Sequence, residues 1–144
     1  MDLALGEAEA AGLSGEVPIG AVVVGVGGEV LARAGNRTLQ LRDPTAHAEL
    51  IAIREACAKL GSERLTGCDL HVTLEPCAMC AAAIVHARVA RLVFGAWDPR
   101  VGAAGSVLNL VNAPVFNHRV DTFGGVLAEE CGTLLRRFFE RKRA

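Results

Sequence analysis

Segments typical of strands and of helices alternate along this chain, and their order constrains its possible folds more than any other feature. A near-continuous apolar run at residues 19–24 predicts a buried strand, and the glycines after it predict a hairpin turn rather than a phosphate-binding loop. A hairpin followed by alternating strands and helices predicts a layered α/β domain with a mixed five-stranded sheet. The predicted strands span 17–26, 29–34, 70–74, 91–95 and 120–123, and the predicted helices span 1–13, 43–60, a segment from Glu75-Pro76 and one from Val126.

The length of 144 residues and the 51% share of hydrophobic residues predict one folded domain over residues 1–144. No uninterrupted apolar stretch approaches the roughly 18 residues that a membrane span requires. Residues 1–16 carry four acidic and no basic side chains, so we expect neither a signal peptide nor a membrane anchor. Five cysteines, an odd number, favour thiol or metal chemistry in a reducing cytoplasm over a disulfide framework.

Four residues with metal or proton chemistry fall at the starts of two predicted helices, His47 and Glu49 in one and Cys77 and Cys80 in the other. The two cysteines are three residues apart, which is the spacing with which two thiolates bind a tetrahedral zinc ion. His47 supplies a third ligand. Three protein ligands leave a fourth position open for water, which distinguishes a catalytic zinc from a closed structural one. The pattern therefore predicts one catalytic Zn²⁺ per chain.

Glu49 is predicted to move protons rather than to bind the metal. Side chains two residues apart on a helix diverge by about 200°, so His47 and Glu49 can converge only beyond the end of the helix. A carboxylate beside a zinc-bound water can take its proton and later deliver protons to the substrate and the leaving group.

Other interpretations of the cysteine pair are a redox dithiol and ordinary buried packing, and the His-Ala-Glu triplet favours zinc over both. A closed structural zinc site would need a fourth ligand. We expect Cys57 and Cys131 in the core, Cys68 at a turn or strand edge, and His71 on the less buried face of its strand. The Cys and His candidates for a fourth ligand are Cys57, Cys68, His71, His86, His118 and Cys131.

The pairing of His47-Ala48-Glu49 with residues 76–80, Pro-Cys-Ala-Met-Cys, resembles the signature of the zinc-dependent nucleoside and nucleobase deaminases. More specifically, the chain resembles the bacterial tRNA adenosine deaminases from near residue 1 to about residue 143. The stretches that carry this likeness beyond the zinc signature include Glu16-Val17-Pro18, Asn36-Arg37, Asp43-Pro44-Thr45-Ala46, Thr73-Leu74-Glu75, Val93-Phe94-Gly95-Ala96, Gly102-Ala103-Ala104-Gly105-Ser106 and Asn117-His118-Arg119-Val120.

The resemblance implies a three-layer α/β/α fold of the cytidine deaminase type, a homodimer, and hydrolytic conversion of the wobble adenosine of a tRNA anticodon to inosine. It implies the same zinc ligands and the same proton-transfer role for Glu49. Asn36 is expected at the base pocket, and the Ala48 N–H is expected to face the adenine edge. Asp98 is expected beside the flipped nucleotide and its 5′ neighbour.

A formal net charge of −1 argues weakly against nonspecific duplex binding, but a local basic patch suffices for an anticodon stem-loop. The last eleven residues carry five basic side chains, and these, Trp97 and Phe139 are candidates for RNA contact. Two alternatives remain open. One is a free-base or nucleotide deaminase acting on guanine, cytosine or deoxycytidylate; the other is a noncatalytic zinc or RNA-binding module, which would not need Glu49.

Overall fold

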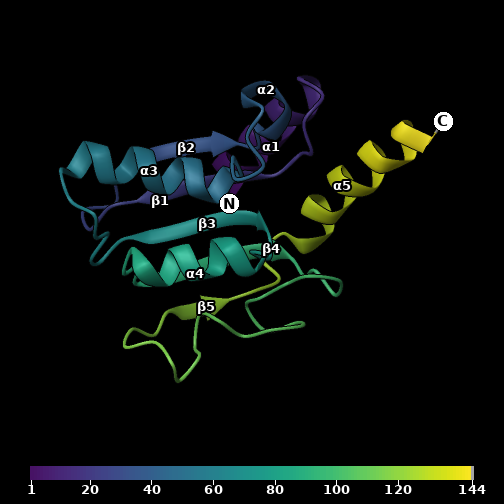
Figure 1. Ribbon diagram of the computed structural model, residues 1–144. Helices are drawn as coiled ribbons and strands as arrows, with labels where there is room; N and C mark the ends of the chain where they lie inside the picture. The colour runs from purple at the N-terminus through teal and green to yellow at the C-terminus, as the bar shows by residue number, and fades with distance from the viewer. Residues whose placement is uncertain (144) are drawn as a thin grey trace.

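The computed structural model describes residues 1–143 and places the five predicted strands side by side in a mixed sheet (Figure 1). Across the sheet the order is β2-β1-β3-β4-β5. β1 is antiparallel to β2 and β3, whereas β4 is parallel to both β3 and β5. The carboxyl ends of β3 and β4 therefore reach the same edge of the sheet. The strands are β1 (Gly20–Val24), β2 (Val30–Gly35), β3 (Asp69–Leu74), β4 (Arg91–Ala96) and β5 (Asp121–Phe123).

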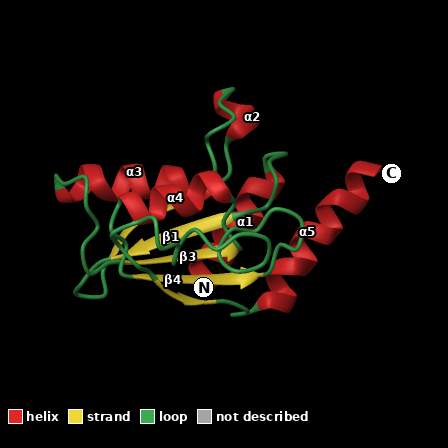
Figure 2. Ribbon diagram, turned by 60° about the horizontal axis from the view of Figure 1, so that its bottom comes forward, coloured by secondary structure: helices red, strands yellow, loops and turns green. Residues whose placement is uncertain are grey.

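Helices cover both faces of this sheet. α3 (Ala48–Leu60) and α4 (Ala78–His86) lie side by side over one face, and α1 (Asp2–Leu13) and α5 (Ala128–Arg143) contact the strands from the other (Figure 2). Successive residues of β1 point to opposite helix layers. Ala21 and Val23 lie in the core beneath α3, whereas Gly20 faces α1. A Cβ atom on Gly20 would lie 2.0 Å from the Ala4 carbonyl oxygen, so only glycine permits this approach. The predicted α/β/α layers are confirmed.

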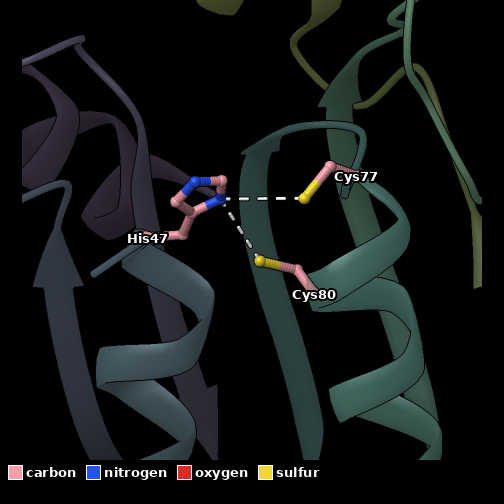
Figure 3. A group of neighbouring side chains, drawn as sticks. All are labelled: His47, Cys77 and Cys80. Atoms are coloured by element: carbon pink, nitrogen blue, oxygen red, sulfur yellow. Dashed lines mark hydrogen bonds between the residues drawn. The ribbon is translucent and has the colours of Figure 1, made fainter. Parts of the chain in front are cut away.

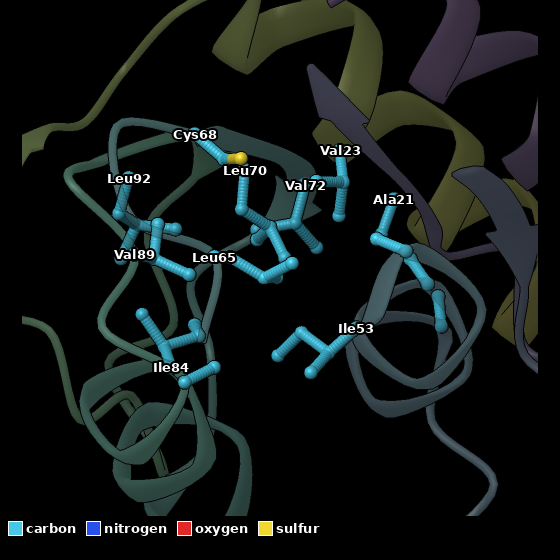
Figure 4. Packing of buried hydrophobic residues seen from close by; sticks show 14 of the residues in the cluster. Ala21, Val23, Ile53, Leu65, Cys68, Leu70, Val72, Ile84, Val89 and Leu92 are labelled. Atoms are coloured by element: carbon cyan, nitrogen blue, oxygen red, sulfur yellow. The ribbon is translucent and has the colours of Figure 1, made fainter. Parts of the chain in front are cut away.

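The main hydrophobic core lies between the sheet and the layer formed by α3 and α4 (Figure 4). Leu70 and Val72 of β3 and Ile84 of α4 are fully buried there, and Ile53 of α3 is 8% exposed. Full burial of an aliphatic side chain of this size contributes about 1.5–3 kcal/mol to stability. This packing fixes α3 and α4 relative to each other, so their N-terminal ends meet beside the carboxyl ends of β3 and β4.

The start of α3 differs from the prediction. The sequence pattern places Asp43 as the helix cap, but its carboxylate accepts hydrogen bonds from the Thr45 N–H and hydroxyl groups, at 2.8 and 2.7 Å. These bonds fold residues 43–46 into a turn, and α3 begins only at Ala48 with His47 as its N-cap. The predicted end is confirmed: Gly61 terminates α3 in the left-handed conformation, with φ at 67°.

Two further details complete the fold. α2 (Thr38–Leu41), which the sequence pattern does not predict, is a short helix that projects from the connection between β2 and α3 (Figure 2). The five cysteines are free, and Cys68 lies between a turn and the start of β3, as predicted, with its side chain buried in the core. Within residues 1–143, no helix combines the length and apolar character that a membrane span requires.

Candidate metal and active site

The predicted zinc ligands meet where the N-terminal ends of α3 and α4 face each other (Figure 3). His47 is the N-cap of α3 and Cys77 is the N-cap of α4, both in extended conformations with φ near −70°. α4 thus begins at Ala78, later than the predicted start at Glu75-Pro76, and Cys80 lies in its first turn. The extended N-cap directs each side chain off the end of its helix, so ligands from two helices converge on one point.

The separation of the three donor atoms fits a zinc ion. His47 Nδ1 lies 3.7 Å from Cys77 Sγ and 3.5 Å from Cys80 Sγ. Ideal Zn–N and Zn–S bond lengths at a tetrahedral centre place a nitrogen and a sulfur ligand about 3.6 Å apart. Within residues 1–143, these three are the only His, Cys, Asp or Glu side chains that cluster closely enough to hold a metal ion. A fourth protein ligand is therefore absent from the cluster, and His47, Cys77 and Cys80 form an open zinc site.

The electrostatics of the cluster suit a cation. Hydrogen bonds from Cys80 and His47 lower the pKa of the Cys77 thiol to about 4. The same interaction with Cys77, together with burial, raises the pKa of the Cys80 thiol. Cys77 therefore favours the thiolate form and Cys80 the thiol form. A divalent metal that binds both sulfurs displaces the thiol proton.

Glu49 lies in the first turn of α3 and is 4% exposed. Burial raises the pKa of its carboxyl group to about 7, although its own backbone N–H and the neighbouring His47 and Cys80 oppose the rise. A carboxyl group with a pKa near neutrality can both accept and donate a proton during a reaction. Glu49 does not belong to the cluster of metal-binding atoms. Its position beside the zinc ligands fits the predicted proton-transfer role, which stays a prediction.

Asn36 and Ala48, which the resemblance assigns to the base pocket, form one hydrogen-bonded unit at the start of α3. The Ala48 N–H donates to the Asn36 side-chain oxygen at 3.0 Å, and both residues are buried. The Ala48 N–H therefore has a partner within the chain. The Asn36 amide NH₂ group remains the donor of this pair. Their contacts with a base stay predictions.

Asp98 lies just after β4, in a loop at the edge of a cavity of about 680 Å³ between residues 96–101 and α5. Its carboxylate accepts hydrogen bonds from the N–H groups of Arg100 and Val101, at 3.0 and 3.3 Å, and so caps a turn. The neighbouring Trp97 is 52% exposed, with its ring edge-on to Phe94 at 4.7 Å between centroids. The structure thus places both predicted loop residues at a cavity that reaches the carboxyl ends of β3 and β4, while the zinc ligands lie outside its lining.

Glu75 is a site residue that the sequence pattern did not single out. It precedes the zinc ligand Cys77 by two residues, is 2% exposed, and accepts hydrogen bonds from Asp98, Ala104 and Ser106. Burial raises the pKa of its carboxyl group, but these hydrogen bonds outweigh burial and hold the pKa below its ordinary value. A buried charge of this kind gives no periodic signal in the sequence. The one sequence signal for a role at the site is its position between a predicted strand and the zinc ligand Cys77.

Comparison with known proteins agrees with this geometry. Residues 1–96 match the cytidine and deoxycytidylate deaminase zinc-binding region. The chain is 54% identical to the tRNA-specific adenosine deaminase of Agrobacterium fabrum over 99% of its own length and 93% of the relative's. It is 50% identical to the same-named protein of Bacillus subtilis, again over 99% of its length and over 88% of the relative's.

Solved structures show the same relation. A structure from a study of A-to-I editing by tRNA:A34 deaminases matches with a TM-score of 0.90 and 53% identity, covering 94% of this chain and 97% of that one. A guanine deaminase from Nitrosomonas europaea matches with a TM-score of 0.80 and 27% identity, covering 95% and 81%. The fold and the three-ligand site define a zinc-dependent deaminase of the cytidine deaminase type. Within that class, the chain belongs to the tRNA-specific adenosine deaminase family.

Proposed function

We propose that this chain hydrolyses the wobble adenosine of a tRNA anticodon to inosine and ammonia. The observation that carries this proposal is an open His-Cys-Cys zinc site with a buried, unligated Glu49 beside it. About 50% identity to tRNA-specific adenosine deaminases over nearly the whole chain supports the choice of substrate. Identity to the guanine deaminase is much lower, at 27%, so a free-base deaminase is the weaker alternative.

Zinc at such a site supplies Lewis acidity that makes water a nucleophile near neutral pH. The chain's own contribution is proton movement at Glu49. Its carboxylate takes a proton from the attacking water, whose oxygen bonds to C6 of adenine, and delivers it to the ring nitrogen N1. A second proton passes through the same carboxyl group to the departing amino group, the C6–N6 bond breaks, and ammonia leaves. General acid–base catalysis of this kind is worth about 10²–10⁴ in rate.

The base and the sugar are assigned to different residues. We assign the adenine edge to the Asn36–Ala48 unit, in which the Asn36 NH₂ group is the donor not used by the bond to Ala48. We assign the ribose to Asp98, whose carboxylate can accept a hydrogen bond from the 2′-hydroxyl while it caps its turn. The cavity between the Asp98 loop and α5 would receive the flanking nucleotides, with Arg136 and Phe139 in its lining.

We also propose that the protein is a homodimer of single-domain chains in the cytoplasm. Exposed apolar side chains accumulate between β4 and α5, including Val107, Leu108, Val115 and Phe123, each 49–81% exposed. A partner subunit would cover such surface. Five free cysteines suit a reducing compartment. Light scattering on the eluting protein tests the dimer: we expect twice the chain mass, and a monomer at micromolar concentration would contradict it.

The activity is tested by incubating the zinc-loaded protein with an anticodon stem-loop that carries adenosine at the wobble position, followed by nucleoside analysis for inosine. Parallel reactions contain free guanine, cytosine, deoxycytidylate and adenosine. We expect inosine in the stem-loop and little turnover of the small molecules. Faster release of ammonia from guanine than from the stem-loop would favour the free-base deaminase instead.

A further inference from the structure

The side chain of Glu75 is surrounded by hydrogen-bond donors from the loop at residues 97–106. Its Oε1 atom accepts from the Asp98 N–H at 2.9 Å and from the Ser106 hydroxyl. Its Oε2 atom accepts from the N–H groups of Ala104 and Ser106, each at 3.0 Å. A carboxylate that accepts four hydrogen bonds while 2% exposed holds its donors firmly, because a buried donor that loses its partner is not compensated by water.

The backbone around Glu75 strengthens the same connection. The Glu75 N–H donates to the Ala96 carbonyl at 2.9 Å, and the Pro76 carbonyl accepts from the Ala103 N–H at 2.8 Å. Gly102 lies so close that a Cβ atom there would be 2.4 Å from the Glu75 carboxylate. The 97–106 loop is therefore wrapped around one side chain, and that side chain belongs to the turn that presents the zinc ligand Cys77.

The loop held in this way lines the cavity between residues 96–101 and α5. Trp97 and Asp98 face this cavity from the loop, and Leu74, the residue before Glu75, lines it from the end of β3. The Asp98 N–H is bonded to Glu75, while the Asp98 carboxylate caps the next turn. A shift of this anchor would move Asp98 and Trp97 relative to the zinc ligands, although Glu75 need not touch a substrate itself.

We propose that Glu75 is a positioning residue, which ties the 97–106 loop to the Cys77 turn and thereby fixes the distance between the metal site and the substrate-facing residues Trp97 and Asp98. The substrate part of this inference rests on the proposed function. The anchoring part does not, because it concerns the loop alone. Because the loop is already ordered before binding, it loses less conformational entropy when a substrate binds.

Glu75→Gln tests the anchor with little change in side-chain size. An amide can accept at one end only. If its oxygen stays with the two N–H groups of Ala104 and Ser106, its NH₂ group faces the Asp98 N–H, and two donors oppose each other. The substitution therefore selectively releases Asp98. Ser106→Ala is a milder second variant, since it removes one hydroxyl donor and retains every backbone bond.

Glu16→Gln is the matched control. Glu16 is also 2% exposed, and it accepts backbone hydrogen bonds from Leu39 and Gln40, at 3.2 and 2.8 Å, but in α2 rather than in the 97–106 loop. Both substitutions should lower the free energy of unfolding. Only Glu75→Gln should alter the environment of Trp97. Trp97 is the single tryptophan of the chain, so its fluorescence reports on the loop alone.

Three quantities are measured on the zinc-loaded proteins: zinc content, acrylamide quenching of Trp97 without RNA, and KM and kcat for the stem-loop. For Glu75→Gln we expect one zinc per chain, stronger quenching, a KM raised about tenfold and a kcat within threefold of wild type. Ser106→Ala should shift quenching in the same direction by less. If Glu75→Gln does not fold, this milder variant decides the anchor.

Unchanged Trp97 quenching in both loop variants would overturn the inference. So would loss of zinc with unchanged quenching, since Glu75 would then support the Cys77 turn alone. An equal rise in quenching for Glu16→Gln would reduce the effect to general destabilisation and also overturn it. Failure of the wild-type protein to form inosine would instead contradict the proposed function, while the quenching data would still decide whether Glu75 anchors the loop.

Discussion

Two buried carboxylates near the zinc site have opposite pKa shifts, because their neighbours differ. Glu49 is buried with few donors, and burial raises its pKa to about 7. Glu75 is equally buried, but four donors surround it and hold its pKa below the ordinary value. The first carboxyl group can exchange a proton during a reaction, whereas the second serves as a fixed negative charge for hydrogen bonding.

The role of Glu49 predicts that binding and chemistry can be separated. Glu49→Ala and Glu49→Gln should each retain one zinc per chain, because Glu49 is not among the three clustered ligands. Their kcat for inosine formation should fall about 10²–10⁴-fold, since the proton path is lost. Zinc content by atomic spectrometry and inosine by nucleoside chromatography measure the two effects. Loss of zinc together with activity would make Glu49 a ligand instead.

Asp98 predicts a preference for ribose over deoxyribose. A carboxylate can accept a hydrogen bond from a 2′-hydroxyl, but next to deoxyribose it has no donor and faces phosphates of like charge. Asp98→Asn keeps an oxygen for the Arg100 and Val101 N–H groups and removes the charge. The ratio of DNA to RNA deamination, measured on matched loops, should rise about tenfold.

Asp121→Asn is the control for this measurement, because Asp121 is exposed on β5 outside the cavity. It should leave the ratio unchanged. A wild-type ratio in Asp98→Asn would mean that Asp98 serves only the turn that it caps.

At the scale of single elements, residue spacing was sufficient to predict the zinc ligands but not the helix starts. The Cys77–Cys80 spacing and the His47-Ala48-Glu49 triplet carry chemistry that few other patterns share. The start of α3 was predicted too early because the Asp43 side chain can either cap a helix or form a turn with Thr45. In the structure it forms the turn. The role of Glu75 has no local signal, because its four donor groups belong to three residues that lie 23 to 31 positions further along the chain.

The strand β3 carries a pH-dependent residue that the reaction does not use. His71 alternates with the core residues Leu70 and Val72, is half-buried as predicted, and its buried Nδ1 atom has no hydrogen-bond partner in the described chain. Burial lowers the pKa of His71, and the nearby N-terminal amine and Arg91 act in the same direction while Asp69 opposes them. The folded chain therefore favours the neutral ring.

This shift predicts how stability changes with pH. Because the folded pKa lies below the unfolded value of about 6.5, the unfolded chain binds a proton first as the pH falls. The contribution of neutral His71 is thus fully present above about pH 6.5 and is lost below it. At pH 7.5 the free energy of unfolding of His71→Phe should equal that of wild type within about 1 kcal/mol. Between pH 7.5 and pH 5 the variant should lose less of this free energy than wild type does. Urea unfolding at each pH measures both. Parallel pH curves would contradict this assignment.

At the scale of the whole molecule, the zinc site joins two helices that the hydrophobic core has already positioned. The core residues between the sheet and these helices, such as Leu65, Leu70 and Ile84, pack without contribution from the metal ligands. His47 and Cys77 lie at the helix N-caps, outside the first hydrogen-bonded turns. Zinc therefore closes one end of a preformed scaffold, unlike in small zinc domains that unfold when the metal is removed.

Metal removal should for this reason lower stability without unfolding the chain. A ligand present at about 1,000 times its Kd stabilises the native state by about 4 kcal/mol, which corresponds to roughly 10 °C in Tm for a chain of this size. After treatment with a chelator, we expect far-UV circular dichroism close to that of the zinc-loaded protein, a Tm lower by about this amount, and recovery on addition of one equivalent of zinc per chain. Unfolding of the chelated protein at 25 °C would show that the zinc is structural. An unchanged Tm would show that the three ligands do not bind the metal, since any ion that binds the folded chain alone must raise its stability.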